Sequence, residues 1–170
     1  MAHVFQLSLA KSAAEVNNPI WRNIYTQAFP TLQAMVSVRD DGWAQRGGID
    51  RVLTLASGKT LLVDEKIREK DYGDILLEYW SNERSKIPGW VAKDLACDYI
   101  AYAVLPTAKC YLLPFQQLRL AWRQNCKEWV YRYKRIVAEN DGYETISVGV
   151  PAGVLLDSIC QAMTIKWVIE

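Results

Sequence analysis

The stretch GGIDRVLTLASGKTLLVDEKIR, residues 47–68, decides how the centre of this chain folds. It contains two runs rich in aliphatic and β-branched residues, 49–55 and 60–67, separated by the short segment 56–58. This pattern predicts two antiparallel strands joined by a tight turn. Acidic residues stand beside the apolar ones in both runs, so the length of the turn determines which charged side chains share a face of the sheet.

Two registers of this hairpin are open. A two-residue turn sets Asp50 opposite Glu65, whereas a three-residue turn sets Asp50 opposite Asp64. Three-residue hairpin loops end with a residue in the left-handed conformation, which Gly58 adopts without steric cost. Two-residue turns prefer Asn-Gly or a leading glycine, and Ser-Gly is neither. The sequence therefore favours the three-residue register.

In that register Asp50, Asp64 and Lys66 share one face. Directly opposite residues have Cβ atoms about 4.5–5.5 Å apart, where like charges destabilise a sheet. A divalent cation between the carboxylates removes this penalty, and Mg²⁺ favours one or two carboxylates, water and phosphate oxygens. An ammonium group beside them can position a nucleophile or stabilise developing charge. The three residues predict a site that hydrolyses phosphodiesters; the alternative is a solvated hairpin face.

The two acidic motifs, GlyIleAsp at 48–50 and AspGluLys at 64–66, resemble those of the PD-(D/E)xK nuclease superfamily. The resemblance implies hydrolysis of DNA with Mg²⁺, for which Mn²⁺ is a substitute. It implies that Asp50 and Asp64 bind the metal with help from the main-chain carbonyl of Glu65, and that Lys66 is the catalytic lysine. Ile49 stands where the family name has proline.

The resemblance also implies a restriction-endonuclease-like αβββαβ core, with a central mixed sheet flanked by helices. The family has a helix after the third strand, whereas residues 74–80 fit a strand equally well. The chain as a whole is expected to be an α/β (α+β) fold forming a single domain over residues 1–170. The remaining elements expected are helices at 12–29, 116–137 and 154–162, and strands at 35–39, 75–80, 97–105, 110–115 and 145–150.

Composition excludes several other classes of function. Twenty basic and nineteen acidic residues give a net charge of +1, so a nucleic-acid surface requires local segregation of charge. Four widely spaced cysteines and one histidine, His3, argue against a structural zinc site, and the chain is too large to need a disulfide framework. No leader or membrane-spanning run is present, and a cytoplasmic protein without membrane contact is expected.

Three further polar residues are candidates for the metal site. Glu15 is either an additional ligand or one half of a helix capping box with Ser12. Gln45 precedes the first acid and either orients a water or a phosphate, or is a plain loop residue. Glu78 lies in an apolar run, where it either completes the metal site or faces solvent from an edge strand.

Two groups of basic residues are candidates for binding phosphates. The first lies around the hairpin and comprises Arg46, Arg51, Arg68 and Lys70. The second lies on the expected helix after Phe115 and comprises Arg119, Arg123, Lys127, Arg132, Lys134 and Arg135. Such groups either contact a nucleic-acid backbone or are simply solvated.

The leading hypothesis is a metal-dependent DNA nuclease. The alternative is a catalytically weak or inactive module of nuclease fold that binds nucleic acid or a protein partner. A third hypothesis, a structural protein whose aromatic residues form a subunit interface, predicts no metal binding. The resemblance also implies a homodimer, because relatives that cut both strands often dimerise.

Overall fold

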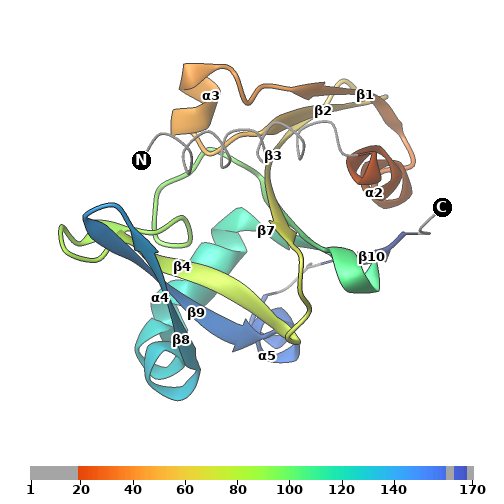
Figure 1. Ribbon diagram of the computed structural model, residues 1–170. Helices are drawn as coiled ribbons and strands as arrows, with labels where there is room; N and C mark the ends of the chain where they lie inside the picture. The colour runs from red at the N-terminus through yellow and green to blue at the C-terminus, as the bar shows by residue number, and fades with distance from the viewer. Residues whose placement is uncertain (1–18, 160–162, 168–170) are drawn as a thin grey trace.

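The computed structural model describes residues 19–159 and 163–167, and shows two β-sheets with helices packed against them (Figure 1). Glu15 lies outside the described residues. In chain order the elements are α2 (Ile20–Ala28), β1 (Leu32–Ser37), α3 (Gly42–Arg46), β2 (Arg51–Leu55), β3 (Thr60–Arg68), β4 (Asp74–Asn82), β5 (Ile87–Pro88), β6 (Tyr99–Val104), η1 (Leu105–Thr107), β7 (Lys109–Pro114), α4 (Phe115–Arg132), β8 (Lys134–Asn140), β9 (Tyr143–Pro151), α5 (Ala152–Asp157) and β10 (Met163–Lys166).

The first sheet has the strand order β1-β2-β3-β6-β7-β10, and the second has the order β5-β4-β9-β8. In the first sheet β3 pairs parallel to β6, whereas the other neighbours are antiparallel. The second sheet is antiparallel throughout. A mixed sheet with helices is the α+β architecture that the sequence predicted. Among the described residues, no helix is both long enough and apolar enough to cross a membrane.

Two hydrophobic cores lie on opposite faces of the first sheet. The outer core joins that sheet to α2 and includes Trp21, Ile24, Tyr25, Leu53, Val63, Ala101 and Leu112. The inner core lies between the two sheets and α4, and includes Ile75, Leu77, Ile100, Leu118, Trp122 and Val148. Because consecutive strand residues point to opposite faces, β3 directs Val63 to the outer core and Asp64 to the inner side.

The hairpin of β2 and β3 has the three-residue register. Arg51 pairs with Val63, and the Leu55 main-chain N donates to the Lys59 main-chain O at 2.9 Å. Gly58 ends the turn with φ of 80°, in the left-handed region. The predicted three-residue register is therefore confirmed from Arg51 onward; Asp50, one residue before β2, donates its main-chain N–H to the Val63 main-chain O.

We expect Gly58→Ala to lower the free energy of unfolding by about 1 kcal/mol, because an L side chain is strained at this positive φ. A Cβ at Gly58 would meet nothing within 4 Å, so the backbone conformation alone carries the effect. Urea unfolding measures it, with Ser57→Ala as the control, expected to change stability by less than about 0.5 kcal/mol. Equal stability of Gly58→Ala and the wild type would show that glycine is not needed for this turn.

Two expected helices have different bounds in the structure, and the strand expected at 75–80 is present. Helix α4 ends at Arg132, five residues before the predicted end, because residues 134–140 instead form β8 and pair with β9. The Asp141-Gly142 turn between these strands, with Gly142 at φ of 80°, is a hairpin signal that outweighed the helical pattern. The last helix is α5, Ala152–Asp157, rather than 154–162. Residues 74–82 form a strand, so β4 rather than a helix follows β3.

Candidate functional site

Asp64 and Lys66 form an ion pair on the inner face of β3. The Lys66 Nζ lies 2.6 Å from Oδ1 of Asp64. The Asp64 side chain is only 5% exposed and that of Lys66 is 32% exposed. The ammonium group also lies over the ring of Trp90, 5.9 Å from its centroid. The acid is thus largely removed from water, while the lysine remains accessible.

Asp50 is the residue immediately before β2, and hydrogen bonds join it to β3. Its main-chain N donates to the Val63 main-chain O at 2.9 Å, and its Oδ2 accepts a hydrogen bond of 2.7 Å from the Glu65 main-chain N. Its Oδ1 lies 3.3 Å from Nε of Arg39. The Asp50 carboxylate therefore accepts a hydrogen bond that a main-chain carbonyl of a neighbouring strand would otherwise accept. This hydrogen bond holds the carboxylate beside the Asp64–Lys66 pair. An ionised carboxylate has about four acceptor sites, so capacity for a further ligand remains.

The electrostatics of Asp64 indicate that the two carboxyl groups are neighbours. Burial raises the pKa of Asp64 from 3.8 to about 6. The Lys66 ammonium group opposes this rise, whereas Asp50 adds to it by repelling the charge and by accepting a hydrogen bond from the protonated form. Two adjacent carboxylates in a poorly solvated place are stabilised by cations, and here Lys66 supplies one positive charge beside Asp64 and Arg39 one beside Asp50.

Lys66 stays protonated at neutral pH. Burial tends to lower the pKa of Lys66, but the carboxylate of Asp64, followed by those of Asp50 and Glu78, raises it above the ordinary value. The side chain is therefore a fixed positive charge and hydrogen-bond donor rather than a free base.

Glu65 turns its side chain to the outer face, away from Asp64. Its Oε1 accepts a hydrogen bond of 2.9 Å from the hydroxyl of Tyr25, and its Oε2 accepts one of 3.2 Å from Nη2 of Arg51. The side chain cannot reach a metal on the inner face. The N–H and C=O of one strand residue point to the same side, so the Glu65 carbonyl points towards Asp50, as its main-chain N does. This carbonyl lies on the same side of β3 as the Glu65 main-chain N, which binds Asp50.

The prediction that Arg51 binds phosphate is wrong. Arg51 is 5% exposed and forms an ion pair with Glu65 on the outer face, through both Nε and Nη2. The strand register causes this, because Arg51 pairs with Val63 and therefore shares the face of Val63 and Glu65.

The other basic candidates lie in different surroundings. Arg46 is exposed on the short helix α3. Arg68 is partly buried, where it donates to Asp74 and to the hydroxyl of Tyr102, both at 3.2 Å. Lys70 is exposed in the loop after β3. Gln45 donates to the main-chain O of Arg39, so it supports the loop before the acids.

Glu78 comes from the second sheet and faces the same space as Lys66. The two residues line a cavity of about 280 Å³ together with Trp90, Tyr102 and Ser147. The Glu78 carboxylate raises the pKa of Lys66 across this cavity. It is therefore in position to interact with the site. The structure thus brings together Asp50, Asp64, Lys66 and the cavity that Glu78 lines.

The residues present fit a weakly held, hydrated cation rather than a closed protein cage. Among residues 19–159 and 163–167, no three His, Cys, Asp or Glu side chains form a group that could hold a metal ion. Mg²⁺ usually binds one or two carboxylates and keeps several waters, completing its octahedron with phosphate oxygens of the substrate. Asp50, Asp64 and the Glu65 carbonyl match this requirement.

Sequence reasoning missed two residues of the site, Arg39 and Trp90. Arg39 bridges Asp50 and Glu65, with its Nη2 3.5 Å from Oε2 of Glu65. Pairing of β1 with β2 brings Arg39 close to Asp50. The strand expected at 35–39 was the sequence signal that could have indicated this position. Trp90 follows Gly89, where a Cβ would overlap the Glu78 main-chain carbonyl. Glycine there indicates close approach of two backbones, but nothing local identifies the partner.

Comparison of the chain with protein-family models, with curated proteins and with solved structures finds no match.

Proposed function

We propose that this protein is a metal-dependent hydrolase of phosphodiester bonds. Within that class, we propose a DNA nuclease of the PD-(D/E)xK type. The observation that carries the proposal is the placement of Asp50 beside the Asp64–Lys66 ion pair on adjacent strands. The raised pKa of Asp64, caused by burial and by the neighbouring Asp50, supports it, because a bound cation would stabilise the charged forms of both acids.

The order of elements supports a restriction-endonuclease-like core. Helix α2 precedes the antiparallel strands β1, β2 and β3, and β6 then pairs parallel to β3. This follows the family's αβββ order and its mixed sheet. The connection from β3 to β6 departs from the family pattern, because it contains β4 and β5 instead of a helix.

Each side chain has a role that follows from its position. A bound Mg²⁺ supplies Lewis-acid polarisation of the scissile phosphate and lowers the pKa of water. Asp50 and Asp64, with the Glu65 carbonyl, would hold that ion. The Lys66 ammonium group donates hydrogen bonds to a water or to a phosphate oxygen, and its charge opposes the negative charge that develops during hydrolysis. Trp90 packs against Lys66 and limits where its Nζ can lie.

A binding module without activity is the second candidate, and one observation favours it. Arg39 lies 3.3 Å from Asp50, so its positive charge competes with a metal for that carboxylate. If Arg39 does not move aside, metal binding is weak and the fold retains nucleic acid without cutting it.

Metal titration and cleavage assays test the proposal together. We expect the wild type to bind Mn²⁺ and to cleave DNA with Mg²⁺ or Mn²⁺, and to lose cleavage in EDTA. Asp64→Asn is expected to bind Mn²⁺ at least about tenfold more weakly, because a ligand charge is removed. Protons compete with metal below the Asp64 pKa of about 6, so affinity should be lower at pH 5 than at pH 7.5.

Isothermal titration calorimetry measures the affinity, and linear, circular and branched DNA report cleavage. Asp94→Asn is the control, because Asp94 is an exposed acid that pairs with Arg119 on α4. Metal binding without cleavage of any substrate would favour the binding module. Equal Mn²⁺ affinity in the wild type and Asp64→Asn would contradict the metal site.

A further inference from the structure

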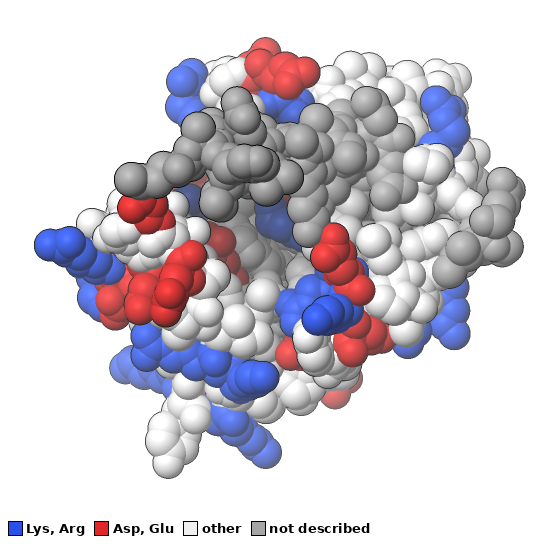
Figure 2. Space-filling model, in the orientation of Figure 1, with Lys and Arg blue, Asp and Glu red and all other residues white. Residues whose placement is uncertain are grey.

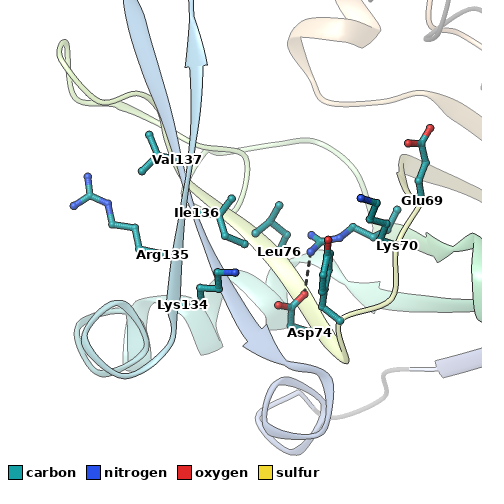
Figure 3. A pocket seen from close by; sticks show the side chains of 10 residues that line it. Glu69, Lys70, Asp74, Leu76, Lys134, Arg135, Ile136 and Val137 are labelled. Carbon is teal, nitrogen blue, oxygen red and sulfur yellow. Dashed lines mark hydrogen bonds and ion pairs between the residues drawn. The ribbon is translucent and has the colours of Figure 1, made fainter.

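A second cavity of about 800 Å³ lies between the end of β3, β4 and β8. We call it the basic groove. Its four basic side chains outnumber its two acidic ones, and its lining comprises Arg68, Glu69, Lys70, Tyr72, Asp74, Leu76, Lys134, Arg135, Ile136 and Val137. Figure 3 shows Lys134 and Ile136 of β8 facing Leu76 of β4, with Lys70 on the far side. Two segments distant in the sequence therefore form its walls.

The lysines of the basic groove are available to a ligand. Lys70 and Lys134 are both exposed, and neither forms an ion pair with another described residue. The acid Asp74 is already paired with Arg68 at 3.2 Å. Figure 2 shows Lys and Arg side chains gathered at the lower left of the molecule, where Figure 1 places β8 and α4. The groove thus offers two uncommitted positive charges.

The basic groove also contains an aromatic ring suited to stacking. Tyr72 is 64% exposed, and the Arg68 guanidinium lies over its ring, 5.2 Å from the centroid. Leu76 and Ile136 add an apolar wall. Cationic side chains that follow the backbone, combined with aromatic rings that stack on bases, characterise sites for single-stranded nucleic acid. In a duplex the faces of the bases are stacked on one another, so such a ring can bind only an unpaired base.

The basic groove adjoins the cavity at Lys66. Arg68 and Leu76 line both spaces, so a strand whose phosphate lies at Lys66 can extend along the groove. A volume of this order holds a ligand of one or two nucleotides.

We propose that the basic groove binds an unpaired segment of the DNA strand that the Lys66 site acts upon. This inference rests on the proposed function for its substrate, and it gives the protein a preference for DNA with a single-stranded tail or branch. Lys70 and Lys134 contact phosphates, and Tyr72 stacks on a base.

Binding of a fluorescein-labelled dT12 oligonucleotide in EDTA tests the inference without any cleavage. We expect Lys70→Ala/Lys134→Ala to bind at least about tenfold more weakly, and the slope of log affinity against log salt to fall by about 0.7 for each lysine removed. Tyr72→Ala is expected to weaken binding about fivefold or more with an unchanged slope, whereas Tyr72→Phe binds like the wild type.

Lys59→Ala is the matched control. Lys59 carries the same charge as Lys70 and Lys134 and is exposed, but it lies beside the hairpin turn, at the opposite end of β3 from Arg68, and does not line the basic groove. We expect Lys59→Ala to lose less than about twofold in affinity for dT12, because phosphate contacts act over short range.

Four results would overturn the inference. They are no binding of dT12 by the wild type, equal binding by the double lysine variant, an equal loss in Lys59→Ala, and competition by thymidine monophosphate as strong as that by unlabelled dT12. Binding of dT12 that depends on Lys70 and Lys134 but without cleavage of any DNA leaves the inference standing and removes the nuclease. If cleavage depends on Lys66 but the lysine and tyrosine variants of the groove bind dT12 like the wild type, the nuclease proposal stands and the inference about the groove is wrong.

Discussion

Lys66→Ala is expected to lower the rate of DNA cleavage by about 10²–10³-fold while Mn²⁺ affinity stays within about threefold of the wild type. Removal of one fixed donor aimed at a charge that develops in the transition state has this magnitude in other enzymes. Lys66 is the protonated group closest to Asp64, at 2.6 Å, and it opens onto the cavity where a phosphate would lie. Asp64 and Asp50 remain in place in this variant, so metal binding should persist.

The measurement compares single-turnover cleavage with saturating metal in the wild type and in Lys66→Ala. Lys59→Ala is the control, because Lys59 directly follows the turn of the same hairpin, is exposed and lies at the opposite end of β3 from Lys66. Lys66→Arg keeps the charge but presents it in a different geometry, so partial activity is expected. Cleavage by Lys66→Ala at the wild-type rate would contradict the role given to this lysine.

Arg51→Ala is expected to lower the free energy of unfolding by about 3 kcal/mol, because it breaks a buried ion pair by removing one partner. The Glu65 side chain has no exposed surface, and Arg51 is the residue that neutralises it most directly. Tyr25 and Arg39 remain beside Glu65 and limit the loss. Activity should fall only in proportion to the unfolded fraction, because Arg51 lies on the face opposite the site.

The destabilisation should grow as the pH rises. Burial raises the pKa of Glu65 above its ordinary value, although Arg51, Tyr25 and Arg39 oppose the rise. Without Arg51 the folded-state pKa rises further above the unfolded value, so the folded state binds the proton more tightly. Folded protein is then favoured at pH 5 and loses stability as Glu65 ionises towards pH 8.

Urea unfolding at pH 5 and pH 8 measures both effects. Arg123→Ala is the control, since Arg123 is exposed on α4 and forms no ion pair with a described residue. Arg51→Met/Glu65→Leu replaces both charges by apolar groups and should recover most of the stability. If Arg51→Ala lowers the free energy of unfolding by less than about 1 kcal/mol at both pH values, the Arg51–Glu65 ion pair contributes little to stability.

Long-range pairing explains where the sequence failed. The role expected for Arg51 was wrong because nothing near residue 51 reveals that α2 covers this face with Tyr25. Residues 134–137 resembled the end of a basic helix, and pairing with the partner strand β9 makes residues 134–140 a strand. β4 follows β3 in the chain but joins a different sheet, which no local pattern predicts.

The hairpin itself was determined by the sequence. Gly58 and the apolar runs on either side specify the turn, and the turn specifies the register, since a slip by one residue would reverse every side chain. The positions of Asp50, Asp64 and Lys66 relative to one another follow from interactions within about 20 residues. Tertiary structure alone decided what surrounds them: Arg39 against Asp50, Trp90 beneath Lys66, and Glu78 across the cavity. These contacts join segments whose meeting depends on how the two sheets pack, which is a property of the whole core rather than of any stretch of the chain.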